Sequence, residues 1–151
     1  MTKENFYTFS EYMRENNFSA SEEDYIEMIY RLCLTERYTR VNDLSIALNV
    51  KPPSTSNMLK RLSEKDLIKH IDYGTIELTI TGKKIGKILL DRHNSVEQFL
   101  TLLNVKDKLL EETEKIEHTM SQETLQAIRK MVEFFNTNPE IWKQFNEFQP
   151  Q

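Results

Sequence analysis

The chain has 151 residues and a net charge of −4, with 38% apolar and 29% charged residues, a balance that allows a buried core and excludes a disordered protein. Only three glycines and four prolines are present, which favours helices over many short strands, and we expect a mainly α fold. The single cysteine, Cys33, excludes an internal disulfide. The chain shows neither a signal-peptide pattern nor an apolar run of about 18 residues, so we expect a cytoplasmic protein that does not enter a membrane.

Residues 1–20 form an N-terminal extension that is rich in aromatic residues but has no clean period, and we assign it no function. A first helix is predicted directly after it. Ser21 and Asp24 have the spacing of a capping box, and apolar residues then recur at helical spacing as far as about Thr35.

A helix-turn-helix pattern follows. Residues 41–48 are predicted to form a short helix, and the paired prolines Pro52 and Pro53 are expected to end it. Ser54 is expected to cap the next helix, which has an apolar stripe at helical spacing. We expect the small side chain of Ala47 to let these two helices cross closely.

The second of these helices carries the candidate DNA contacts. With its apolar side turned inward, five polar residues face outward: Ser54, Ser56, Asn57, Lys60 and Arg61. The Asn57 amide can form two hydrogen bonds with adenine, whereas hydroxyl and basic side chains suit phosphates. Between residues 51 and 70, five basic residues stand against two acidic ones, so this segment is locally positive. The alternative is that these residues are the solvated surface of a small helical domain.

A β-hairpin is predicted next. Two short runs rich in β-branched residues, 67–71 and 76–80, flank a turn in which Gly74 can take a positive φ. Three helices followed by a hairpin are typical of a winged helix-turn-helix.

The rest of the chain is predicted to be helical. A long amphipathic segment extends from Thr81 to about Asn104, and two more helices are expected at roughly 106–119 and 121–136, with a final turn after Pro139. The apolar stripes of the last helices exceed what one small domain needs to bury, which indicates a homodimer.

Three residues on the first helix and on the long amphipathic segment could contribute to a cation site. Asp24 and Glu27 are three residues apart on the first helix, so both carboxylates project from one face. His93 stands alone on the long amphipathic segment. The alternatives are a solvated acidic pair and a histidine held by ordinary hydrogen bonds.

A stronger indication of a cation site comes from Glu114, Glu117 and His118, which share one face of a predicted helix. Between residues 107 and 123, six carboxylates stand against two lysines. Like charges on adjacent turns repel each other, and a bound cation would relieve that repulsion.

These segments resemble the diphtheria-toxin-repressor (DtxR) family, and specifically its manganese-sensing (MntR) branch. The resemblance extends from about Ser21 to Phe135. The matching segments are residues 23–27, the Pro- and Ser-rich turn into the recognition helix, and residues 82–87, 92–93, 97–100 and 116–118.

The resemblance implies a winged helix-turn-helix DNA-binding domain at 21–81. It implies an all-helical metal-binding and dimerisation domain at 82–151, without the C-terminal SH3-like domain of many iron-sensing relatives. Base contacts would fall near Pro53 and Asn57. The implied metal ligands are Asp24, Glu27, His93, Glu114, Glu117 and His118, in a binuclear site with two Mn(II) per subunit.

The expected function is a manganese-responsive transcriptional repressor. In the iron-sensing branch a Met stands where this chain has Asp24 and a Cys where it has Glu117, and a carboxylate and imidazole set suits Mn(II) better than those softer ligands. The protein would bind double-stranded operator DNA as a homodimer and control genes for manganese uptake. The alternative within the family is an iron-responsive or broad divalent-metal repressor.

Two rival functions come from outside the family. A di-metal carboxylate enzyme needs Glu-x-x-His pairs, but Lys115 stands three residues before His118 and no HExxH motif occurs, so we expect no enzyme. A winged-helix regulator of an organic ligand is the other rival, and it would leave the six candidate ligands unexplained.

Overall fold

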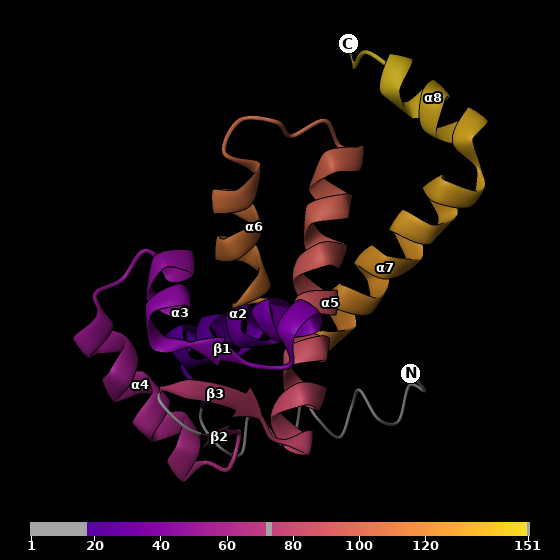
Figure 1. Cartoon of the computed structure of the whole chain (residues 1–151). Coiled ribbons are helices and arrows are strands. Elements are labelled where there is room, and N and C mark those ends of the chain that lie inside the picture. The colour runs from indigo at the N-terminus through magenta and orange to yellow at the C-terminus, as the bar shows by residue number, and fades with distance from the viewer. Residues whose placement is uncertain (1–17, 72–73, 151) are drawn as a thin grey trace. The chain divides into compact units, whose positions relative to one another are not determined.

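The computed structural model describes residues 18–71 and 74–150 (Figure 1). Most of the N-terminal extension and the tip of the predicted hairpin lie outside the described residues. The chain divides into two compact units, Met1–Leu90 and Asp91–Gln151. Helices predominate in both, as predicted from the composition. Among the described residues, none of the helices combines the length and the apolar character needed to cross a membrane.

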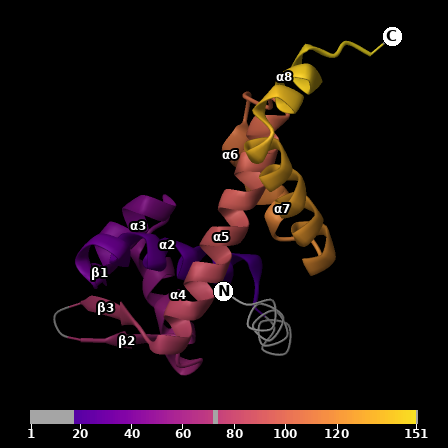
Figure 2. The same cartoon turned by 90° about the vertical axis from the view of Figure 1, so that its right-hand side faces the viewer.

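The first unit is a winged helix-turn-helix, as predicted. Its elements, in chain order, are α2 (Ala20–Glu36), β1 (Thr39–Arg40), α3 (Val41–Leu48), α4 (Pro52–Glu64), β2 (Ile68–His70) and β3 (Thr75–Leu78). The strands form an antiparallel sheet in the order β1-β3-β2, whose hairpin is visible in Figure 2. β3 is the central strand, with Thr39 opposite Ile76 on one side and Ile68 opposite Leu78 on the other. The short strand β1 was not predicted.

The helix starts differ from the prediction. The capping box of α2 is formed by Ser19 and Glu22 rather than by Ser21 and Asp24: each side chain accepts a hydrogen bond from the other residue's backbone N–H, both at 3.1 Å. The prediction of Ser54 as the cap of α4 was also wrong. Pro52 opens α4 as its first residue, because proline's fixed φ suits a first helical turn, in which no backbone N–H is needed.

The helix-turn-helix is built around a small core and a buried group of hydroxyls. Ser45 on α3 donates to Thr55 Oγ1 on α4 at 2.8 Å, and the Tyr25 hydroxyl lies 3.5 Å from the same oxygen. Ala47 is exposed, so Ser45 and not Ala47 is the small residue where the helices meet. The largest side chains buried around these hydroxyls are Ile26, Ile29, Leu44, Leu59, Leu62, Leu67 and Ile76.

Helix α5 (Ile80–Leu102) begins in the first unit and continues into the second. Its first turn is held by Thr79 Oγ1, which accepts from the Gly82 N–H at 3.0 Å. A side chain at Gly82 would place its Cβ 2.0 Å from the Leu67 carbonyl oxygen, so only glycine allows this close approach.

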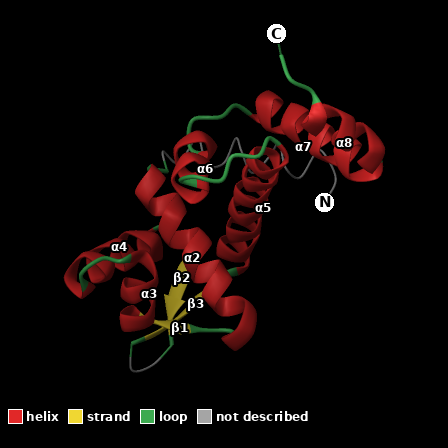
Figure 3. Cartoon of the chain, turned by 90° about the horizontal axis from the view of Figure 1, so that it is seen from above, coloured by secondary structure: helices red, strands yellow, loops and turns green. Residues whose placement is uncertain are grey.

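The second unit consists of the rest of α5 with α6 (Leu109–Glu117), α7 (Gln122–Thr137) and α8 (Pro139–Glu147), all coloured as helix in Figure 3. Arg129 on α7 donates to Ser95 on α5 at 3.1 Å, and Trp142 on α8 donates to the Leu102 carbonyl at 3.1 Å. The segment after Pro139 is a helix of nine residues, longer than the predicted turn.

Candidate metal centre and DNA-contacting surface

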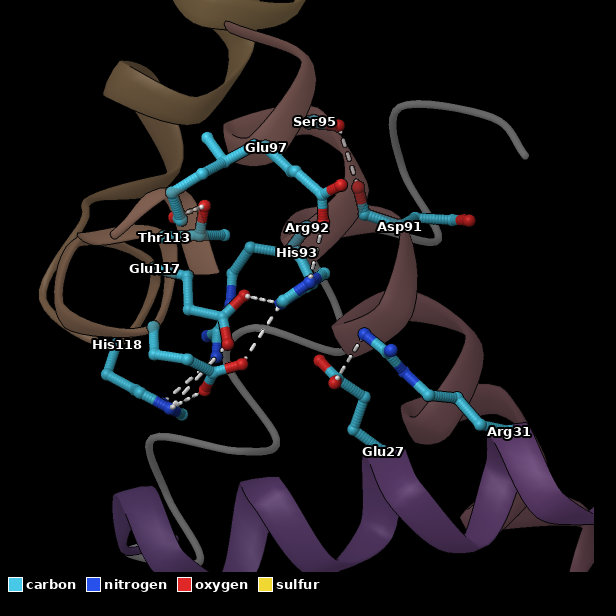
Figure 4. A network of polar contacts seen from close by, with 12 residues as sticks. Glu27, Arg31, Asp91, Arg92, His93, Ser95, Glu97, Thr113, Glu117 and His118 are labelled. Carbon is cyan, nitrogen blue, oxygen red and sulfur yellow. Dashed lines mark hydrogen bonds and ion pairs between the residues drawn. The ribbon is translucent and has the colours of Figure 1, made fainter. Parts of the chain in front are cut away.

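Four of the six predicted ligands come together in the second unit, and Figure 4 labels three of them, His93, Glu117 and His118. His93 projects from α5, and the other three project from the end of α6. His93 Nδ1 lies 3.1 Å from Glu117 Oε2 and 3.3 Å from Glu114 Oε1. His118 Nε2 lies 3.7 Å from Glu117 Oε1 and 3.8 Å from Glu114 Oε2. We call these four residues the His-Glu cluster.

The local structure of α6 explains this arrangement. Residues three and four apart share a helix face, so Glu114, Glu117 and His118 point the same way. His118 is the C-cap of the helix. Lys115, on the other face, pairs with Glu111 at 2.7 Å and with Glu112 at 3.3 Å, and these carboxylates raise the pKa of Lys115. Those two acidic residues are therefore not part of the cluster.

The electrostatics of the His-Glu cluster favour a cation. Glu117 is 1% exposed, and its Oε2 accepts no hydrogen bond from any described residue. A carboxylate in such a position is costly unless a positive charge lies beside it. Two carboxylates also crowd one ring nitrogen of His93, which adds repulsion. Both features are relieved when a cation is bound.

Two residues that were not predicted as functional hold the imidazoles of the cluster. Glu97 Oε2 lies 3.1 Å from His93 Nε2, and Arg92 Nη2 lies 3.3 Å from His118 Nδ1. His93 therefore has one nitrogen facing the Glu97 carboxylate and the other turned toward Glu114 and Glu117, an arrangement that orients histidine ligands in metal sites. Arg92 can only donate, so its contact with His118 Nδ1 holds that ring in place without matching this arrangement. The spacing of four residues between His93 and Glu97 was a signal that could have indicated this contact.

The two remaining predicted ligands, Asp24 and Glu27, lie on α2 in the first unit. They share one face of the helix because they are three residues apart. Asp24 is half-buried, whereas Glu27 is 7% exposed and forms an ion pair with Arg31 at 2.9 Å. A buried carboxylate on this helix is consistent with a ligand role.

The donor set of the His-Glu cluster fits a hard or borderline divalent cation. His93, Glu114 and Glu117 each offer one ligand atom within 4.8 Å of the others, and so do Glu114, Glu117 and His118. All the donors are carboxylate oxygens and imidazole nitrogens, which suit Mn(II), Fe(II) and Zn(II) and do not select soft ions. Cys33 lies on α2, where burial and Glu77 raise the pKa of its thiol, and it is not part of the cluster.

The predicted DNA-contacting residues all lie on α4 and are exposed. They are Pro53, Ser54, Ser56, Asn57, Lys60 and Arg61. Thr55, Leu59 and Leu62 occupy the opposite, buried face. The polar face of α4 is thus available to a major groove, which admits one α-helix.

Two family models match the chain. The model described as "Iron dependent repressor, N-terminal DNA binding domain" matches residues 17–76. The model described as "Iron dependent repressor, metal binding and dimerisation domain" matches residues 79–146.

The chain is similar to transcriptional regulators from several bacteria. It is 39% identical over 123 residues to the HTH-type transcriptional regulator MntR of Bacillus pumilus, covering 81% of this chain and 85% of that protein. It is 35% identical over 134 residues to the MntR protein of Lysinibacillus sphaericus, covering 88% and 96%.

Two solved structures share the fold. The structure of IdeR from T. acidophilum superimposes with a TM-score of 0.67 at 29% identity, over 76% of this chain and 55% of that one. The manganese regulator SloR superimposes with a TM-score of 0.67 at 29% identity, over 75% and 54%. The chain therefore spans about half the length of these two solved structures.

Proposed function

We infer that this chain, which belongs to the iron-dependent repressor family, is a manganese-responsive transcriptional repressor that binds operator DNA as a homodimer. The relatives are transcriptional regulators, and a DNA-binding domain followed by a metal-binding and dimerisation domain is the family's arrangement. A bacterial repressor must reach the chromosome, which lies in the cytoplasm. We therefore include a cytoplasmic location in the proposal.

The observation that carries the proposal is the His-Glu cluster. Among the described residues, no hydrogen-bond donor reaches the buried Oε2 of Glu117, which lies beside a second carboxylate and two imidazoles. Such a group of side chains favours a bound cation. The family description supports a divalent metal. We propose Mn(II) on the donor chemistry, because neither a thiolate nor a thioether is among the six proposed ligands.

We propose that Asp24 and Glu27 complete the ligand set and that two Mn(II) bind per subunit. The support is chemical: two more carboxylates share one face of α2, and six protein ligands are more than one ion with bound water requires. The metal ions would neutralise carboxylates that otherwise repel one another.

We propose residues 21–81 as the DNA-binding domain, with α4 as the recognition helix, and residues 82–151 as the metal-binding and dimerisation domain. Asn57 would contact a base, with Pro53 beside it, while the other exposed residues of α4 would contact phosphates. Residues 1–20 receive no function.

The proposed switch follows from the ligand set. Ligands drawn from α2 and from α5 and α6 would make metal binding favour one arrangement of the dimer, in which two recognition helices match successive major grooves about 34 Å apart. Without metal, repulsion among the carboxylates would disfavour that arrangement. The metal is then a corepressor, and the repressed genes are those for manganese uptake.

A second function within the family is an iron-responsive or broad divalent-metal repressor. The family model is named for iron-dependent repressors, which supports this second function. The carboxylate and imidazole donors of the cluster also suit Fe(II) and Zn(II). Zn(II) binds such sites more tightly than Mn(II), so metal affinity by itself does not identify the physiological metal.

The experiment is a DNA-binding titration with metal-stripped protein and the promoter of a manganese transporter. Mn(II), Fe(II) under anaerobic conditions, and Zn(II) are added in turn to the wild type and to Glu117→Ala. Glu111→Ala is the matched control, because Glu111 lies on the same helix but pairs with Lys115 outside the cluster.

Activation by Mn(II) in the wild type and in Glu111→Ala, but not in Glu117→Ala, supports the proposal. Stronger activation by Fe(II) favours the iron-responsive function. Equal DNA binding with and without metal refutes the switch and favours a regulator of an organic ligand.

A further inference from the structure

One ion pair in the first unit engages a proposed metal ligand. Arg31 Nη2 lies 2.9 Å from Glu27 Oε2, one helical turn along α2, and Figure 4 shows the guanidinium turned toward that carboxylate. Glu before Arg at this spacing is the favourable order for a pair on a helix. The proposed metal ligand Glu27 therefore already has a positively charged partner on its own helix, the guanidinium of Arg31.

The burial of the pair is unequal. The Glu27 side chain is 9% exposed, whereas that of Arg31 is 34% exposed. Arg31 Nε and Nη2 are buried and make no hydrogen bond within the part of the chain that the structure describes. Charge, and not directed hydrogen bonding, holds the guanidinium at the carboxylate.

We propose that Arg31 is an internal counter-ion that competes with metal for the Glu27 carboxylate and so raises the Mn(II) concentration at which the protein responds. The inference rests on the proposed role of Glu27 as a ligand. A metal ion at Glu27 must displace a guanidinium that already neutralises the carboxylate. If the guanidinium stays nearby, its charge also repels the arriving dication.

The direction of the effect separates this proposal from a supporting role for Arg31. If Arg31 competes, removing its charge strengthens metal binding. If Arg31 instead orients Glu27 for the metal, as residues behind metal ligands do, its removal weakens metal binding. Because the pair is partly exposed, we expect Arg31→Gln to bind Mn(II) about threefold to tenfold more tightly.

The test measures Mn(II) binding to the full chain by the electron paramagnetic resonance signal of free Mn(II), without DNA. Arg31→Lys retains the charge and is expected to stay close to wild type. Arg37→Gln is the matched control: it removes the same charge from the same unit, but its partner is Glu77 at 3.4 Å. Circular dichroism and thermal unfolding verify that each variant is folded.

A double-mutant cycle with Glu27→Gln distinguishes the possible failures. Tighter Mn(II) binding in Arg31→Gln, lost in the Glu27→Gln background, supports the proposal. Unchanged or weaker binding in Arg31→Gln, when Glu27→Gln does weaken binding, overturns it and leaves the ligand role of Glu27 intact. If Glu27→Gln leaves Mn(II) binding unchanged, the ligand role of Glu27 is wrong and the competition proposal falls with it.

Discussion

Replacing Glu117 with Gln is expected to stabilise the metal-free protein while removing most of the stabilisation that Mn(II) provides. The proposed ligand oxygens of Glu117 and Glu114 lie within 4.8 Å of each other. At an effective dielectric constant of about 20, two such charges repel by about 3 kcal/mol. Because the Glu114 side chain is 40% exposed, solvent screening reduces the expected gain on removing one charge to about 1 kcal/mol.

The assay is thermal and urea unfolding at pH 8, where an ordinary histidine is neutral. A gain of about 1 kcal/mol corresponds to a rise of about 2–4 °C in the melting temperature of a chain of this size. With Mn(II) at about 100 times its dissociation constant, the wild type should gain about 2.7 kcal/mol and Glu117→Gln much less. The order of stability of the two proteins is thus expected to reverse when metal is added.

The control is Glu111→Gln on the same helix, whose ion pair with Lys115 is exposed and screened by solvent, so its loss should leave the stability almost unchanged. If Glu117→Gln is less stable than the wild type without metal by more than about 1 kcal/mol, the reasoning is refuted. In that case the histidines already neutralise Glu117 in the metal-free protein, and repulsion is not what a metal relieves.

Two further predictions concern the first unit. Thr55→Val removes the hydroxyl that accepts from Ser45 and lies beside the Tyr25 hydroxyl, so urea unfolding should show a loss of about 1–3 kcal/mol. DNA binding should weaken while Mn(II) affinity stays unchanged, and an unaltered unfolding midpoint would contradict this. Desolvation opposes ionisation of Glu77, but the basic side chains of Lys69, Arg37 and Lys83 together outweigh it, Lys69 most strongly, and lower the pKa of Glu77. Glu77 therefore stabilises the fold above about pH 4.5 and less as pH falls, so Glu77→Gln should flatten the acid side of the stability profile, and an unchanged slope would argue against it.

The sequence predicted the helices and the hairpin because their periodicity reflects burial on one side of each element. Residues 41–48 were assigned to a helix with the bounds that the structure has. The helix starts were less accurate, since several residues compete for each cap. Ser19 and Ser21 both precede a carboxylate by three residues, and the structure uses Ser19. Ala47 and Ser45 are both small, and only packing decides which of them faces α4.

The His-Glu cluster could be predicted only in part from the sequence. The shared helix face of Glu114, Glu117 and His118 follows from their spacing. The addition of His93 came from resemblance to a family, because its distance along the chain carries no geometric information. The contact of Glu97 with His93 and the ion pair of Arg31 with Glu27 both join residues four apart on a helix. Pairs with this spacing are common on helices, so the spacing alone does not show which of them contribute to a metal site.

The sequence by itself determined the fold class, the order of the elements and the chemical types of the proposed ligands, because these depend on local periodicity and on which side chains are present. Only the tertiary structure decided that Glu117 is buried, with its Oε2 out of reach of any hydrogen-bond donor in the described part of the chain, and that two carboxylates converge on His93. Burial and convergence depend on contacts between segments that are distant in the chain. A sequence pattern does not contain those contacts, although they determine the strength with which the cluster attracts a cation.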